Sequence, residues 1–161
     1  NIAVYIDQSG SVSNGELELL FGCLRDLAKR TEFTTFHFDT EVDTDSETVW
    51  RGGRTPEAHR TRCGGTDFDC VNTHANKNKH RFDGYLILTD GYAADPGHTL
   101  LKRGWVLTTY CAIADFRAGS YDAIYIYILP ESKRLQTLKA IFFFFVSLLV
   151  SLIPQSNENP T

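Results

Sequence analysis

The sequence lacks methionine entirely and holds only four cysteines in 161 residues. The cysteines form no CxxC pair, and no signal peptide stands ahead of them, so they give no sign of a disulfide framework. They lie at Cys23, Cys63, Cys70 and Cys111. We therefore expect a reducing, cytoplasmic setting. The chain opens at Asn1 without an initiator methionine, which is consistent with missing residues ahead of it.

A basic stripe of the kind that follows a phosphate backbone is also lacking. The formal net charge is −4, and Lys and Arg are scattered along the chain. We therefore expect no nucleic-acid partner, whereas an acidic balance is compatible with cation binding. A length of 161 residues suits one domain with its own core.

The apolar run at residues 140–153, AIFFFFVSLLVSLI, falls short of the roughly 20 residues that a membrane-spanning helix needs. We weigh three interpretations of it: a buried element, a membrane anchor, and the product of a shifted reading frame. We favour an atypical hydrophobic C-terminal extension over membrane contact. The domain is accordingly placed at residues 1–109, with residues 110–161 as an extension of uncertain structure.

Short apolar runs alternate with stretches of helical spacing along the first part of the chain. Such runs are typical of strands buried on both faces of a parallel sheet. We expect strands at residues 2–6, 32–38, 48–50, 84–88 and 104–108, an acidic loop after the second, and helices at 17–28, capped by Ser13 or Asn14, and at 68–79. This order predicts an α/β fold with a doubly wound, mostly parallel sheet and helices on both faces.

Oxygen-bearing side chains follow two of the predicted strands. Asp7, Ser9 and Ser11, in the stretch DQSGS, come after the first strand, and Asp90 comes after the strand GYLIL. Thr66 lies in the loop GGTDF ahead of the second helix. In open α/β sheets the ligand lies beyond the carboxyl ends of the strands. We therefore expect these five side chains to meet at one edge of the sheet.

A carboxylate and several hydroxyls at one centre suit a hard cation such as Mg²⁺, which takes about six oxygens and only one or two carboxylates. Alternating positions on a tight turn let Asp7, Ser9 and Ser11 point toward one centre. Gly10 is expected to let that turn bend, and Gly64 and Gly65 to let the second loop bring the Thr66 hydroxyl close. Turn and cap chemistry is the alternative interpretation of DQSGS alone.

The ordered motifs D-x-S-x-S, GGTDF and LTDG resemble those of the von Willebrand factor A domain family. In that family the five matching positions form a metal-ion-dependent adhesion site. The resemblance implies that Asp7, Ser9, Ser11, Thr66 and Asp90 bind Mg²⁺, or else Mn²⁺ or Ca²⁺. It also implies a binding function without a reaction, in which an Asp or Glu of a partner protein completes the coordination of the ion.

Within that family the motifs are similar to those of prokaryotic domains at the carboxyl end of metallopeptidase-like proteins, which often accompany MoxR-type AAA ATPases. Such an ATPase is therefore a candidate partner by analogy. The HExxH motif of the peptidase-like half is absent, so peptidase activity is not carried over. Asp39 and Asp67 are expected to support the ion's ligands, and Asp67 alternatively caps the second helix.

Two enzymatic alternatives use the same edge of the sheet. Ser9, Asp90 and His98 occur in the chain order of α/β-hydrolases, although the frame around Ser9 lacks the G-x-S-x-G pattern. The other alternative is a phosphatase with Asp7 as its nucleophile, although such a site would need a second acid two residues later, where Ser9 stands instead. A zinc site is a further alternative, and its ligands would be Cys63, Cys70, His74 and His80.

Overall fold

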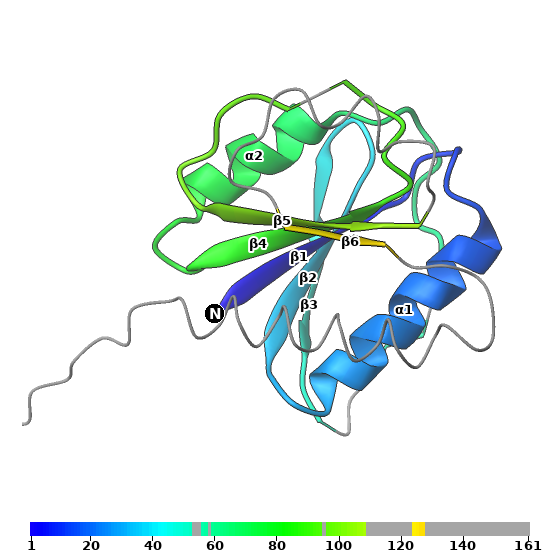
Figure 1. Cartoon of the computed structure of the whole chain (residues 1–161), viewed down its shortest axis with the longest axis horizontal. Coiled ribbons are helices and arrows are strands. Elements are labelled where there is room, and N and C mark those ends of the chain that lie inside the picture. Colours follow the sequence, from blue (N-terminus) through cyan, green and yellow to red (C-terminus); the bar gives the residue numbers. More distant parts are fainter. Residues whose placement is uncertain (53–55, 58, 95, 109–123, 128–161) are drawn as a thin grey trace, which may run out of the picture.

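The structure, a computed structural model, describes residues 1–52, 56–57, 59–94, 96–108 and 124–127 of the chain. Strands and helices alternate along these residues (Figure 1). In chain order they are β1 (Ile2–Asp7), α1 (Asn14–Ala28), β2 (Phe33–Phe38), β3 (Val42–Trp50), α2 (Phe68–Lys77), β4 (Gly84–Thr89), β5 (Lys102–Leu107) and β6 (Ile124–Tyr127).

The strands form one sheet in the order β3-β2-β1-β4-β5-β6. β1 is parallel to both β2 and β4, and β5 is parallel to β4, whereas β3 runs antiparallel to β2. The chain builds outward from β1 to β3 on one side and then returns to add β4, β5 and β6 on the other. This is the doubly wound, mostly parallel sheet that the sequence predicts.

The two helices cover opposite faces of the sheet, as Figure 1 shows. Every residue of β1 is buried, because alternate side chains enter different cores. Val4 and Ile6 belong to the apolar cluster beneath α1, and Tyr5 belongs to the cluster beneath α2. The prediction of helices on both faces is therefore confirmed.

A capping box fixes the start of α1. The Ser13 Oγ accepts a hydrogen bond from the Glu16 N–H at 3.2 Å, and Glu16 Oε2 accepts one from the Ser13 N–H at 2.8 Å. Glu16 Oε1 also accepts from the Thr108 hydroxyl, which follows β5, at 2.7 Å. Ser13 is thus the N-cap, and α1 begins directly after the DQSGS loop.

The acidic stretch after β2 is a strand, so the predicted loop was wrong. β3 begins at Val42, well ahead of the predicted strand at residues 48–50. β3 lies at the edge of the sheet, and most of its side chains are half-buried or exposed. An edge strand tolerates charged side chains because they stay in water. The sequence alone does not show which strand occupies an edge.

β6 extends the sheet by pairing parallel with β5, and it lies among the residues assigned to the C-terminal extension. The other residues of 110–161, including Cys111 and the apolar run at 140–153, lie outside the described part of the chain. Within the described ranges, neither helix has the length and apolar character needed to cross a bilayer.

The packing of α1 against the sheet makes a first prediction. Leu20 is fully buried in the α1 core, whereas Glu18, two residues earlier, is exposed. We expect Leu20→Ala to lower the free energy of unfolding by about 2–5 kcal/mol, because it removes buried methyl groups and leaves a cavity. Glu18→Ala should change it by less than about 0.5 kcal/mol. Urea unfolding measures both, and equal losses would contradict the described orientation of α1.

Candidate functional site

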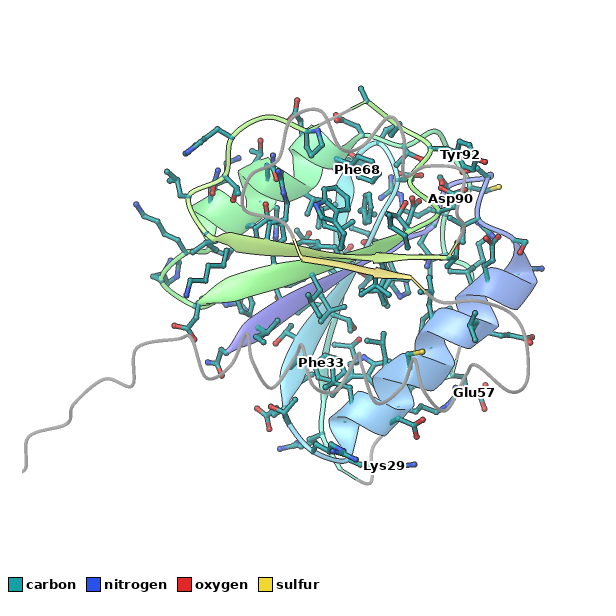
Figure 2. The ribbon with its side chains drawn as sticks, viewed as in Figure 1. Lys29, Phe33, Glu57, Phe68, Asp90 and Tyr92 are labelled. Atoms are coloured by element: carbon teal, nitrogen blue, oxygen red, sulfur yellow. The ribbon has the colours of Figure 1, made fainter. Side chains whose placement is uncertain are left out.

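The order of the strands reverses at β1, so the switch point of the sheet lies between β1 and β4. Asp7 ends β1, and Asp90 directly follows β4. The two residues are 0% and 1% exposed. Figure 2 shows Asp90 at the edge of the sheet, beside the loop that leads into α1. Two carboxylates thus stand together at the position where doubly wound sheets bind ligands.

Asp7 is held by hydrogen bonds on both of its oxygens. Oδ1 accepts from the Ser9 N–H at 2.8 Å, and Oδ2 accepts from the Thr89 hydroxyl at 2.5 Å. Burial raises the pKa of Asp7 above its usual value, the bonds from Thr89 and Ser9 oppose that shift, and the Asp90 carboxylate adds to it. The ionised form of Asp7 is therefore disfavoured in this buried position, and a neighbouring cation would stabilise it.

The hydroxyls of Ser9 and Ser11 face each other, with their Oγ atoms 3.1 Å apart. Ser9 is buried, whereas Ser11 is exposed. Gly10 between them does not have a positive φ, so the bend does not require glycine on that account. Gly10 acts instead through its N–H, which donates to the Gly64 carbonyl at 3.0 Å. That bond joins the DQSGS loop to the loop that carries Thr66.

Asp39, which follows β2, anchors the Thr66 loop. Its Oδ2 accepts from the Gly64 N–H at 3.2 Å, and its Oδ1 forms an ion pair with Arg62 Nε at 3.1 Å. The Asp39 carbonyl accepts from the Asp67 N–H at 2.9 Å. Burial acts to raise the pKa of Asp39, but backbone N–H donors at Glu41 and Thr40 and the Arg62 guanidinium outweigh it and lower the pKa. Asp39 is thus a charged support of this loop.

The close approach to Asp39 falls at Gly64 rather than at Gly65. A Cβ at Gly64 would lie 2.8 Å from Asp39 Oδ2, whereas a Cβ at Gly65 would meet Thr40 at an ordinary 3.6 Å. Of the two glycines that the sequence prediction names, Gly64 is the one at the close approach. The absence of a side chain at Gly64 lets the backbone lie directly on the Asp39 carboxylate.

Asp67 caps α2, as one of the two interpretations predicts. Its carboxylate accepts from the Asp69 N–H at 2.9 Å, and α2 runs from the predicted Phe68 to Lys77, two residues short of the predicted end. Thr66 is half-buried between the anchored Gly64 and this cap. No hydrogen bond among the described residues joins Thr66 to the other four predicted ligands. The structure thus places Thr66 in the loop that lies beside the DQSGS loop.

The donor set suits a hard cation in its chemistry. Within the described ranges, no group of three or more His, Cys, Asp and Glu side chains is arranged to hold a metal. The predicted set has only two such side chains, Asp7 and Asp90, and takes its other oxygens from hydroxyls. Each carboxylate oxygen has lone pairs for a hydrogen bond and a cation together, so the bonds from Ser9 and Thr89 leave Asp7 able to bind an ion.

Thr89 is the supporting residue that the sequence analysis did not single out. Its hydroxyl donates to Asp7 and accepts from the Gly91 N–H at 3.0 Å, so it links the ends of β1 and β4. The available signal was its place directly before Asp90 in LTDG. That position is informative only once the register of β1 and β4 is known. Ile6 is paired with Leu88, so the next residues along the two strands, Asp7 and Thr89, lie beside each other.

The enzymatic alternatives gain nothing from the arrangement of their residues. His98 is exposed, and no hydrogen bond of the described residues joins it to Ser9, whose Oγ contacts Ser11 instead. A nucleophilic Ser needs a base within hydrogen-bond reach.

The proposed zinc ligands are not gathered into a site within the described ranges. Cys63 and His80 are exposed, His74 Nδ1 is bonded to the Tyr5 hydroxyl at 2.8 Å, and the Cys70 thiol donates to the Asp67 carbonyl at 2.9 Å. His74 and Cys70 thus have separate local partners, as expected for helix residues.

Comparison with known proteins places this geometry in a fold. No family model matches the chain, and none of the curated protein sequences does. The chain is similar to the structure of an aerotolerance-related membrane protein from Bacteroides fragilis, with a TM-score of 0.55 at 12% identity, over 91% of this chain and 98% of that one.

Two further similar structures carry the name of a fold family. One is VWA2, a paralog of ArnB, from Sulfolobus acidocaldarius, with a TM-score of 0.55 at 16% identity over 84% of this chain and 42% of that one. The other is a von Willebrand factor type A structure from Catenulispora acidiphila, with a TM-score of 0.53 at 10% identity over 87% and 41%. The chain has the von Willebrand factor A fold, as its motifs predict.

The cost of burying Asp7 gives a second prediction, made for buffer that contains a chelator. Because the pKa of Asp7 is raised in the folded state, its contribution to stability is greatest below the unfolded value of about 4 and is lost as the pH rises through the folded value. We expect Asp7→Asn to match the wild-type protein at about pH 3 and to be more stable at about pH 7.

Urea unfolding at the two pH values checks this expectation. Asp83→Asn is the matched control, because Asp83 is an exposed acid at the opposite end of β4. The control should show no such gain. An Asp7→Asn protein that is less stable than the wild type at the higher pH would contradict the expectation.

Proposed function

We propose that this chain is a metal-ion-dependent protein-binding module. In this proposal Asp7, Ser9, Ser11, Thr66 and Asp90 hold a divalent cation, Mg²⁺ in the first place and Mn²⁺ or Ca²⁺ as alternatives. The side chain of an Asp or Glu from a partner protein completes the coordination. The von Willebrand factor A fold supports an interaction module in general, and the contacts among Asp7, Ser9, Ser11 and Asp90 support the finer assignment.

The observation that carries the proposal is the pair of buried carboxylates at the switch point. Asp7 and Asp90 are both at most 1% exposed, and the charge of Asp90 adds to the rise in the pKa of Asp7. Two like charges in a buried site are unfavourable without a counter-charge. A divalent cation between the ends of β1 and β4 would neutralise both.

The hydroxyl ligands determine what the ion would do. Ser9, Ser11 and Thr66 contribute neutral oxygens, so two carboxylates leave a divalent ion without surplus negative charge. Such an ion remains attractive to a further carboxylate. Ser11 is exposed, and an incoming acidic group would therefore approach from its side. The chain's own residues supply binding and orientation, and the proposal requires no reaction.

The partner and the cellular setting belong to the same proposal. A MoxR-type AAA ATPase is the partner suggested by the resemblance of the motifs. A cytoplasmic location is suggested by the spacing of the cysteines, and Cys63 and Cys70 are free thiols in the structure, with Cys63 exposed. An exposed free thiol suits a reducing compartment.

Calorimetric titration with Mg²⁺ and Mn²⁺ tests the ion site. We expect saturable binding of about one ion by the wild-type protein and a loss of affinity of at least about tenfold in Asp7→Asn, because the variant lacks the central negative charge. Asp83→Asn changes the same residue type at the other end of β4 and should bind like the wild type. Equal affinity in Asp7→Asn and Asp83→Asn would overturn the site assignment.

A pull-down tests the second half of the proposal, the recognition of a partner. With the wild-type chain as bait, we expect a partner recovered in Mg²⁺ to be lost on addition of EDTA and lost with Asp7→Asn. Asp83→Asn should retain it. A partner that stays bound in EDTA would show that recognition does not use the ion.

A further inference from the structure

Arg60 binds the loop that carries Ser9 and Ser11 through three backbone carbonyls. Its Nη1 donates to the Gln8 carbonyl at 2.6 Å and to the Ser9 carbonyl at 2.8 Å. Its Nη2 donates to the carbonyl of Val12. One guanidinium thus holds the DQSGS loop at both ends, although Arg60 is about 50 residues away along the chain.

Two further bonds attach the same loop to the residues that follow Arg60. The Thr61 N–H donates to Gln8 Oε1 at 3.0 Å, and the Gly10 N–H donates to the Gly64 carbonyl at 3.0 Å. Gln8 is fully buried, so its side chain has a fixed place. Residues 60–64 therefore hold the first loop along its length, and the same stretch of chain leads to Thr66.

A guanidinium suits this role for physical reasons. Its donors lie in one plane and at fixed angles, so carbonyls that bind to it are fixed relative to one another. The three carbonyls bound by Arg60 thereby determine the orientation of their peptide planes between Asp7 and Val12. A lysine ammonium keeps the charge but lacks the planar fork that binds several carbonyls at once.

We propose that Arg60 is the positioning residue of the candidate ion site, where it holds the Ser9 and Ser11 hydroxyls in place and fixes the DQSGS loop relative to the loop of Thr66. This inference rests on the proposed function, since it concerns the same ion. Arg60 does not touch the ion itself. It acts through the carbonyls of Gln8, Ser9 and Val12.

Because Arg60 is positively charged, an electrostatic effect and a positioning effect would change the affinity for the ion in opposite directions. A cationic side chain beside a cation site repels the ion, so a purely electrostatic neighbour would weaken binding, and its removal would strengthen it. A positioning residue has the opposite effect: its removal disorders the loop and weakens binding. Arg60→Ala removes both the charge and the fork, whereas Arg60→Lys removes only the fork.

The experiment is a titration of Mn²⁺ into the wild-type protein, Arg60→Ala, Arg60→Lys and Arg30→Ala. Arg30 is an exposed arginine beyond the far end of α1 and serves as the matched control. We expect Arg60→Ala and Arg60→Lys to raise the Kd for Mn²⁺ by about 10–100-fold, the usual effect of losing a group that orients metal ligands. Arg30→Ala should leave the Kd unchanged.

Chemical rescue separates positioning from a general loss of structure. Millimolar guanidinium chloride should restore part of the Mn²⁺ affinity of Arg60→Ala, because the free ion can occupy the place of the missing side chain. Sodium chloride at the same ionic strength should not. Thermal unfolding in EDTA identifies any variant that fails to fold. If Arg60→Ala fails to fold, Arg60→Lys carries the test, because it keeps the charge and most of the side chain.

The outcomes distinguish the two proposals. If the wild-type protein and Arg30→Ala bind no Mn²⁺, the proposed function fails and the inference about Arg60 falls with it. If the wild-type protein binds Mn²⁺ and folded Arg60→Ala binds it equally or more tightly, the inference about Arg60 alone is overturned. Weaker binding in both Arg60 variants with rescue by guanidinium supports it.

Discussion

β1 and β4 are parallel neighbours in the middle of the sheet, and their register places Asp7 beside Thr89 and Asp90. The junction of Asp7, Thr89 and Asp90, on which the candidate site is centred, follows from this pairing. The Thr89 hydroxyl closes the junction by donating to Asp7, and the chain leaves the two strands in different directions, which opens the edge of the sheet. The helices on the two faces bury both strands and so hold this register, because a shift of one residue would exchange the side chains of the two cores.

Burial affects charge at the candidate site. Asp7 and Asp90 are both buried, and for Asp7 burial also makes the negative charge unfavourable. The carboxylate of Asp39, at the end of the adjacent strand β2, is stabilised differently. It accepts hydrogen bonds from backbone N–H groups and forms an ion pair with Arg62, so its charge is balanced within the chain. Neighbouring strands thus end in acids of different kinds. One supports a loop, and the other two, Asp7 and Asp90, lie at the switch point of the sheet.

The central strands and the places of Asp7 and Asp90 at the strand ends could be predicted from the sequence, because both depend on local patterns. Short, continuous apolar runs such as residues 2–6 and 84–88 are characteristic of strands buried on both faces. The residues that support the site could not be predicted. Arg60 contacts Ser9 and Thr89 contacts Asp7 across long stretches of chain, and neither contact leaves a spacing pattern. The first part of β3 was predicted as a loop because its acids suit a strand only at an edge.

The acidic edge strand has a consequence for how copies of this protein behave in a crowded solution. β3 leaves one side of its backbone without a neighbouring strand among the described residues, and an open edge is a template for pairing with another chain. Asp43 and Asp45 on that strand make two such edges repel each other at neutral pH. The acidic side chains of this strand thus oppose the edge-to-edge pairing that its open backbone would otherwise allow.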